Sequence, residues 1–391
     1  AVDWEAEVRV NGREAGTHRG GYDRFTFDVT DALRPAGEQE VTVAVRDPAD
    51  GGPQPRGKQV RAPEGIFYTP VTGIWQTVWL EPVPESNIEQ LRVIPDLPRG
   101  EVARAVKTTE GGIVEAVVRA EGRELARARG SAGLEFTIDV PSPRRWTPDD
   151  PFLYDLEVLL HRDGRVVDSV KSYFGMRSIA LGKDAGGVTR LLLNGAFVFQ
   201  VGPLDQGYWP DGLYTAPTDE AMKSDIQAMK GLGFNMVRKH VKVEPERWYY
   251  WCDTLGLLVW QDMPSGDVGV GPAEEGGGKP REIVRTAESA AIFERELEAL
   301  IAGRSHHPSI VMWVPFNEGW GQYDTVRILN RVKALDPTRL VDGASGWNHF
   351  PAGDVIDHHQ YPGPGLPPRV TDRAMVLGEF GGRLSTSKGL G

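Results

Sequence analysis

The sequence predicts a multidomain protein of mixed β and α/β class. We expect a jelly-roll-type sandwich, then an immunoglobulin-like sandwich, and then a (β/α)8 barrel. In the first part of the chain, apolar side chains recur at every second position in short runs, which is the period of a strand with one buried face. Beyond Gly182, helical periods alternate with short apolar runs, which is typical of a parallel sheet covered by helices.

The composition limits what the chain can do. Its 391 residues are 40% hydrophobic, enough for two or three domains with cores of their own. The formal net charge of -11 disfavours nucleic acid and anionic membranes as partners, so a neutral ligand such as a sugar fits better. The single cysteine, Cys252, excludes an internal disulfide and leaves the cellular compartment open, and no apolar run is as long as a membrane span.

Residues 1–86 are the expected first sandwich. Alternation begins at Trp4 and runs to Val10, where Asn11-Gly12 is a typical hairpin turn. The same period returns at Phe25 to Val29, at Val41 to Val45 and at Ile74 to Leu80. Because a jelly roll needs about eight strands and we find fewer, we expect that residues before Ala1 are missing.

Residues 87–178 are the expected immunoglobulin-like sandwich, which begins after Pro82-Val83-Pro84 interrupts the first pattern. Short alternating runs separated by glycine, proline and aspartate predict its strands. These runs are Ile88–Ile94, Ile113–Ala120, Phe136–Val140, Tyr154–Leu160 and Val166–Phe174.

Residues 179–391 are the expected barrel. Thr218 is a predicted N-cap, and a second helix is expected between Pro245 and Gly256. Further helices are expected at Ala290–Ile301 and Tyr323–Leu335. The expected strands are Phe197–Val201, Phe234–Val237, Leu257–Trp260, Ile310–Val314, Arg339–Val341, Val355–Ile356 and Ala374–Gly378. A closed barrel has one strand more, so we expect that its last strand and helix are missing too.

Polar residues follow most of these strands, at the end where (β/α)8 barrels carry catalytic groups. Taken singly, each has a structural explanation as plausible as a functional one: Arg238 and Asp262 as an ion pair, His358 and His359 as solvated loop residues, Tyr361 as a rim aromatic. Two glutamates favour the functional explanation, because Glu318 follows strand four and Glu379 follows strand seven. Two facing carboxylates suit cleavage of a glycosidic bond, in which one donates a proton and the other, ionised, attacks. We expect Glu318 to be the acid, and Arg238 and Tyr361 to stabilise the charge of Glu379.

Three motifs in this region resemble glycoside hydrolase family 2, which includes β-galactosidases, β-glucuronidases and β-mannosidases. They are Gly233-Phe-Asn-Met-Val-Arg-Lys-His240, the run from Pro308 to Asn317-Glu318, and Val376-Leu-Gly-Glu-Phe-Gly381. Gly73-Ile-Trp-Gln76 resembles a turn of the family's jelly roll, and Tyr173-Phe-Gly-Met-Arg177 resembles its junction into the barrel. The resemblance therefore extends over nearly the whole chain.

The resemblance implies a retaining exo-β-glycosidase with Glu318 as general acid/base and Glu379 as nucleophile. It implies that Asn317 binds the substrate 2-hydroxyl, that Arg238 and His240 lie on the substrate side, and that Tyr361 orients the nucleophile. Our further candidates for substrate binding are Asp262, His359 and Asp205, with Trp320 and Trp347 as apolar faces for a sugar ring.

Some alternatives stay open. Residues 202–209, which include Asp205, depart from the Asn-His-Glu segment of better-known members, so the sugar is not specified. Residues 265–288 lack the histidines with which some members hold magnesium, so we expect no metal and no cofactor. Since adjacent histidines seldom point the same way, structural roles are expected for His306 and His307. A carbohydrate-binding protein without turnover is the alternative function.

Overall fold

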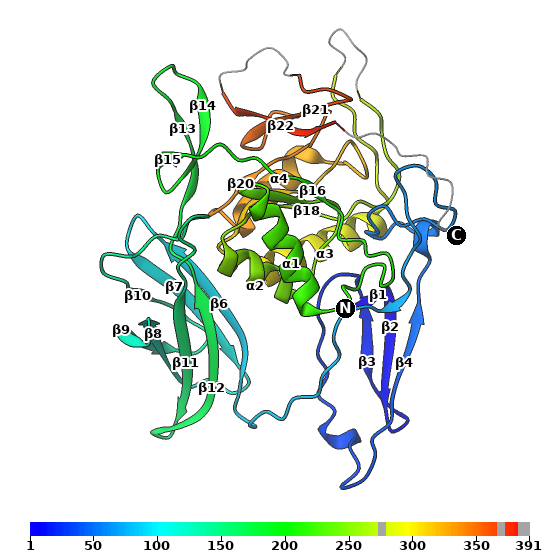
Figure 1. Ribbon diagram of the computed structural model, residues 1–391. Helices are drawn as coiled ribbons and strands as arrows, with labels where there is room; N and C mark the ends of the chain where they lie inside the picture. Colours follow the sequence, from blue (N-terminus) through cyan, green and yellow to red (C-terminus); the bar gives the residue numbers. More distant parts are fainter. Residues whose placement is uncertain (273–278, 366–371, 382–391) are drawn as a thin grey trace.

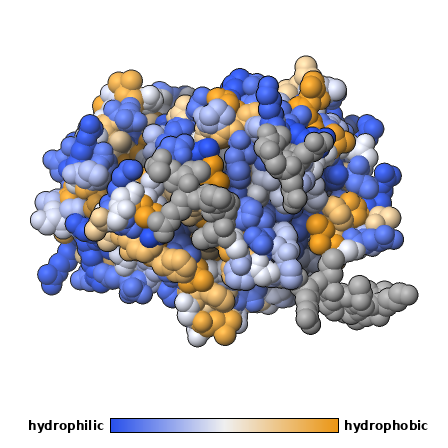
Figure 2. Space-filling model, turned by 90° about the horizontal axis from the view of Figure 1, so that it is seen from above, coloured by the Kyte–Doolittle hydropathy of each residue, from blue (hydrophilic) through white to orange (hydrophobic). Residues whose placement is uncertain are grey.

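The computed structural model describes residues 1–272, 279–365 and 372–381. Two β-rich units lie at the lower left and lower right of Figure 1, and the parallel strands with their helices lie between and above them. This arrangement confirms the predicted fold class of β-sandwich units followed by a parallel β/α unit. Seen from above, hydrophilic residues cover much of the visible face, with hydrophobic groups between them (Figure 2). None of the helices in the described ranges is long and apolar enough to cross a lipid bilayer.

The N-terminal unit contains the predicted hairpin. Strand β2 (Glu5–Val10) lies between β3 (Arg13–Arg19) and β4 (Val41–Arg46) in one antiparallel sheet. Asn11 and Gly12 have φ values of 52° and 80°, the left-handed backbone that a two-residue hairpin turn requires. Beside this sheet, β1 (Val2–Asp3) pairs with β5 (Gly73–Ile74).

One strand predicted for this unit is not formed, and another is formed only at its first residue, Ile74. Phe25, Phe27 and Val29 keep their alternation in burial, but the chain there is irregular and leads into the short helix η1 (Thr30–Ala32); a second such helix is η2 (Ala49–Gly51). The end of the predicted Ile74 to Leu80 strand is exposed, with 64% of Val78 and 68% of Leu80 open to solvent. An alternating pattern becomes a strand only where a neighbour pairs with its backbone. In the described part of the chain β1 pairs with the second run only at Ile74, and residues 25–29 and 76–80 lie in no strand.

The second unit is a sandwich of two antiparallel sheets. One sheet has the order β10-β7-β6 and the other the order β12-β11-β8-β9. All five predicted strands are present, whereas β7 and β9 were missed because Ala and Arg alternate in much of both. The strands are β6 (Ile88–Asp96), β7 (Glu101–Thr108), β8 (Ile113–Ala120), β9 (Arg123–Ser131), β10 (Glu135–Asp139), β11 (Tyr154–Arg162) and β12 (Arg165–Phe174).

The third unit carries parallel strands. Five of them lie in the order β16-β17-β18-β19-β20, and β21 pairs in parallel with β22. They are β16 (Leu204–Asp205), β17 (Met236–Lys239), β18 (Leu258–Asp262), β19 (Ile310–Val314), β20 (Leu340–Val341), β21 (Val355–Gln360) and β22 (Ala374–Phe380). The connecting helices are α1 (Asp219–Gly231), α2 (Glu246–Leu255), α3 (Ala287–Arg304) and α4 (Thr325–Leu335).

The first barrel strand was placed wrongly. Residues 198–203 form no strand, and the parallel sheet begins instead with the two residues of β16. Ala196 and Phe197 form β15 (Ala196–Phe197), which pairs antiparallel in a separate sheet with β14 (Thr189–Leu193) and β13 (Ile179–Lys183). The turn at Asn194 and Gly195, with φ values of 53° and 80°, explains the error, because it folds this segment back as a hairpin.

Buried contacts join both sandwich units to the barrel unit. Trp75 of the first unit packs in one core with Tyr214 and Trp248. In the second, Trp146 donates from Nε1 to the carbonyl of Asp253, 2.8 Å away. Arg177, at the junction, donates to the carbonyl oxygens of Pro308 at 2.9 Å and Ile310 at 2.7 Å. The junction is therefore tied to the start of β19, the strand that leads to Glu318.

Candidate active site

Glu318 lies where the chain leaves β19. The strand is fully apolar, and no residue of it is more than 1% exposed. Beyond it, the amide of Glu318 donates to the carbonyl of Ser345 at 2.9 Å, and Glu318 itself has a φ of 52°. A non-glycine residue in this left-handed region costs roughly 1–3 kcal/mol and is typical of functional sites. The bend therefore holds the Glu318 carboxylate at the end of the sheet.

Arg238 joins the ends of four strands. Its Nε and Nη2 atoms each lie 3.0 Å from an oxygen of Asp262, a bidentate pair. Nη1 donates to Glu379 and Nη2 to Asn317, both at 2.9 Å. Arg238 is 2% exposed and Asp262 is 0% exposed. The ion pair that was expected between them is present, and it continues to both of the other residues.

Glu379 is ionised by its surroundings. Burial alone would raise the pKa of its carboxyl group, but Arg238, followed by His240, His359 and Tyr361, holds the pKa below the ordinary value. His240 lies with Nδ1 at 3.1 Å from Asp262 and at 3.7 Å from Glu379. Burial lowers the pKa of this histidine below its ordinary value. The carboxylate is thus poised to attack rather than to donate a proton.

Tyr361 contacts both glutamates. Its hydroxyl lies 2.5 Å from Oε2 of Glu379 and 3.3 Å from Oε1 of Glu318. One oxygen of each carboxylate lies within 4.8 Å of the other. The two residues are 61 positions apart in the sequence. They come from two separate sheets, since β19 belongs to the five-stranded sheet and Glu379 lies on β22.

His359 is the second neighbour of Glu318. Its Nδ1 lies 2.8 Å from Oε1 of Glu318, and its Nε2 lies 2.7 Å from the hydroxyl of Ser345. Burial lowers the pKa of the imidazole, but Asp357, Glu318 and Glu379 together raise it to about 9. His359 therefore carries a proton next to Glu318 at neutral pH. Asp357, in turn, accepts from the Ser345 hydroxyl at 2.7 Å and from the Gly378 amide at 2.6 Å.

Asp205 and Trp320 lie apart from this group, and Trp347 lies at its edge. Asp205 pairs with Lys239 at 2.6 Å, because it stands opposite Lys239 in the sheet and shares its face, while Arg238 points the other way. Trp320 stacks on Phe67, with ring centroids 5.5 Å apart. Trp347 lies edge-on to His359 at 6.1 Å, and its buried Nε1 has no hydrogen-bond partner in the described residues.

Sequence reasoning missed Lys58, which comes from the N-terminal unit. Its side chain is buried, and burial lowers the pKa of the amine while Glu379 and Glu318 oppose this. The amides of Arg56 and Gly57 anchor the backbone here by donating to the carbonyl of Ser265 at 2.8 and 2.9 Å. No signal in the run 52–59 points to the barrel. Ser345 and Asp357 were missed for a similar reason, since they touch His359 rather than end a strand motif.

The same group could hold a cation. Glu318, His359 and Glu379 each offer one ligand atom, and these atoms lie within 4.8 Å of one another. The hydrogen bond between His359 and Glu318 and the 3.7 Å ion pair between His359 and Glu379 also account for this closeness.

Buried paired carboxylates at the C-terminal ends of parallel strands are typical of glycoside hydrolases. Two family models match the chain: "Glycosyl hydrolases family 2, TIM barrel domain" over residues 215–361 and "Glycosyl hydrolases family 2" over residues 88–177. The chain belongs to glycosyl hydrolase family 2.

Relatives agree with this assignment. A β-galactosidase of Thermoanaerobacter pseudethanolicus is 26% identical over 86% of this chain and 44% of its own length. A β-glucuronidase of Bacteroides fragilis is 27% identical over 87% of this chain and 50% of its own length. This chain thus spans half or less of these curated relatives. The solved β-glucuronidase of Ruminococcus gnavus in complex with D-glucuronic acid shares the fold, with a TM-score of 0.72, 20% identity, and coverage of 88% of this chain and 59% of that one.

Proposed function

We propose that the chain carries the catalytic machinery of a retaining exo-β-glycosidase that cleaves a terminal β-linked sugar. The observation that carries the proposal is the separation of Glu318 and Glu379, of which one oxygen each lies within 4.8 Å of the other. Retaining enzymes hold their two carboxyl groups about 5 Å apart, whereas inverting enzymes need roughly 6.5–9.5 Å for a water molecule.

In this proposal Glu379 is the nucleophile. It attacks the anomeric carbon and forms a glycosyl-enzyme ester, while the leaving oxygen takes a proton from the Glu318 side. Glu318 and His359 share that proton across 2.8 Å. In the second half-reaction the same pair takes a proton from water, which attacks the anomeric carbon and releases Glu379.

The other groups act on substrate binding and charge. Arg238 and Tyr361 keep Glu379 ionised until it reacts, and Asn317, whose Oδ1 is fixed by Arg238 at 2.9 Å, presents its amide to the sugar 2-hydroxyl. Lys58 and the unpartnered Nε1 of Trp347 are further donors on the substrate side. We propose the division at residues 1–86, 87–178 and 179–391, with the first unit completing the site through Lys58.

The relatives named above are β-galactosidases and β-glucuronidases by their printed names, so both sugars belong in the test. We expect turnover of a nitrophenyl β-galactoside or β-glucuronide and a loss of at least about 1000-fold in Glu379→Gln, which keeps the shape but not the charge. Azide should not restore turnover in Glu379→Gln, because this variant forms no glycosyl-enzyme ester that azide could release. In Glu379→Gly the small azide anion occupies the place of the nucleophile, so this variant should yield the α-glycosyl azide. Binding of these sugars without turnover would support the carbohydrate-binding alternative instead.

A further inference from the structure

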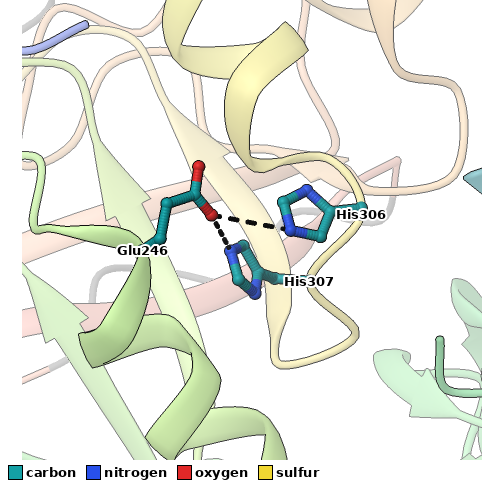
Figure 3. A group of neighbouring side chains, drawn as sticks. All are labelled: Glu246, His306 and His307. Atoms are coloured by element: carbon teal, nitrogen blue, oxygen red, sulfur yellow. Dashed lines mark hydrogen bonds and ion pairs between the residues drawn. The ribbon is translucent and has the colours of Figure 1, made fainter. Parts of the chain in front are cut away.

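A second group of ligand-type side chains lies apart from the proposed active site. Glu246 begins α2, and His306 and His307 lie in the loop between α3 and β19. Oε2 of Glu246 is 3.0 Å from Nε2 of His307 and 3.6 Å from Nε2 of His306. Figure 3 shows both rings turned to this one oxygen. The sequence suggested that adjacent histidines point apart, but here they converge.

The spacing suits a metal ion. All three ligand atoms lie within 4.8 Å of one another. Metal–ligand bonds of about 2.0–2.2 Å in a tetrahedral arrangement place ligand atoms about 3.3–3.6 Å apart. The distance of 3.6 Å is at the upper end of that range and the distance of 3.0 Å is below it, so a shift of a few tenths of an ångström would be enough to admit an ion.

The surroundings orient these ligands. Oδ2 of Asp253 lies 2.6 Å from Nδ1 of His307 and also accepts from the hydroxyl of Tyr173 at 2.9 Å. A carboxylate on the far nitrogen of a histidine is the arrangement that fixes metal-binding imidazoles. Arg304 donates to Oε1 of Glu246 at 2.5 Å, which holds the carboxylate and leaves Oε2 to the histidines.

The group is open on one side. Glu246, His306 and Arg304 line a cavity of about 530 Å³, and Glu89 and Lys171 of the second sandwich line its other side. None of the residues of the proposed active site lines it. An ion held by three protein ligands would therefore find its fourth ligand, water or a small anion, in this cavity.

The competing explanation is an ion-pair network in which a protonated His307 bridges Asp253 and Glu246. Burial opposes the charge, but Asp253 and Glu246 raise the pKa of His307 above its ordinary value. That network accounts for His307. The ring of His306 packs on that of His307, with centroids 4.0 Å apart, and edge-on to Tyr173, but the network gives no role to its Nε2, which lies 3.6 Å from Glu246.

We propose that Glu246, His306 and His307 bind one divalent first-row transition metal ion, with Zn²⁺ the best fit, at a site separate from the glycosidase centre. Two imidazoles and one carboxylate favour Zn²⁺ over Mg²⁺ or Ca²⁺, which prefer all-oxygen sites. Binding would displace the proton from Nε2 of His307 and join α2 to the loop before β19. The proposal does not depend on the sugar that the active site takes.

The test is calorimetric titration of the chelator-treated protein with Zn²⁺, repeated with Co²⁺, whose visible spectrum reports tetrahedral nitrogen and oxygen ligands. We expect one equivalent to bind, and we expect His306→Asn to weaken that binding at least tenfold while turnover of the glycoside is unchanged. His161→Asn is the matched control, because His161 also lies beside a glutamate, with Nε2 at 3.3 Å from Glu115, but has no second histidine.

Three outcomes would overturn the proposal. They are no Zn²⁺ binding by the parent at micromolar concentration, equal binding by His306→Asn, or binding that is lost only in Glu318→Gln, which would place the ion at the Glu318, His359 and Glu379 group. Since His306 is partly exposed, its substitution should leave the fold intact, and circular dichroism checks this. Glu246→Gln is a second variant, in which binding should also weaken at least tenfold.

Discussion

The charge of Glu379 is set by side chains from several strands. Arg238 comes from β17, Tyr361 follows β21, and Glu379 itself lies on β22. The Tyr361 hydroxyl donates to the carboxylate, and burial, together with the two glutamates beside it, raises the pKa of the tyrosine well above its usual value. The phenol therefore stays protonated and remains a donor throughout the accessible pH range.

Removing that donor should shift the pH dependence of catalysis. The hydrogen bond from Tyr361 is one of the contacts that lower the pKa of Glu379, so Tyr361→Phe should raise it. Since Glu379 acts when ionised, the acid limb of kcat/KM should move to higher pH, and kcat at the optimum should fall about 10- to 100-fold. A pH–rate profile with an unmoved acid limb would contradict this assignment.

Most of the charged group could be predicted from the sequence, because Arg238, Asp262, Asn317, Glu318 and Glu379 all stand at or next to the ends of apolar runs. Lys58 could not, since nothing in its neighbourhood marks it as part of the barrel. Asp205 was taken for a site residue because it too ends a strand. The pairing that turns it toward Lys239 depends on the register of a two-residue strand, which periodicity cannot define.

At the scale of elements, helix α3 shows how a buried acid can join two units. Glu296 faces away from solvent and accepts from Nε1 of Trp4 in the N-terminal unit at 2.9 Å. Burial is the main cause that raises the pKa of this glutamate from 4.5 to about 8. The folded protein therefore keeps a proton there that the unfolded chain loses at a lower pH.

This proton makes stability depend on pH. The contribution of Glu296 to stability is largest below pH 4.5. It declines between pH 4.5 and about 8, because folding must then bind a proton from solution, and it is constant above pH 8. Glu296→Gln keeps the acceptor for Trp4 but has no proton to lose. We expect its melting temperature to exceed that of the parent by a few degrees at pH 8 and the difference to shrink at pH 5. Glu288→Gln, at an exposed position of the same helix, should show no such trend.

Strands and helices in which apolar residues recur regularly were predicted well, whereas short or polar strands were not. The helix α1 starts after Thr218, whose hydroxyl accepts from the Ala221 amide at 3.0 Å, as its sequence indicated. In contrast, β9 carries charged and alanine side chains with most positions exposed or half-exposed. Such a strand forms because β8 pairs with it, which is information that its own residues do not contain.

At the scale of the whole molecule, the change in the period of the apolar residues marks where the parallel sheet begins. The contacts between the units could not be predicted from the sequence. Arg177 is the clearest example. It is buried, and burial is the main cause that lowers its pKa. Its three donors nevertheless all reach backbone carbonyls of the barrel unit, those of Pro308, Ile310 and Thr338.

Loss of Arg177 should weaken the whole assembly. Arg177→Met keeps the aliphatic bulk but leaves three carbonyl groups without this donor, at about 1–3 kcal/mol for each one that stays buried. We expect urea unfolding, followed by tryptophan fluorescence, to show a loss of about 3 kcal/mol or more. Arg165→Met, at an exposed position of β12, should change the free energy of unfolding by less than about 0.5 kcal/mol.

The segment 52–68 has a consequence for engineering. It leaves the N-terminal unit, reaches Ser265 and Trp320, and carries Lys58 toward both glutamates. At Gly57 a β-carbon would lie 2.5 Å from the carbonyl oxygen of Val241, so the two backbones touch. A minimal barrel cut free of its first 86 residues would thus lose part of its own wall. Conversely, exchanging this one loop between homologues offers a route to new sugar selectivity without redesigning the barrel.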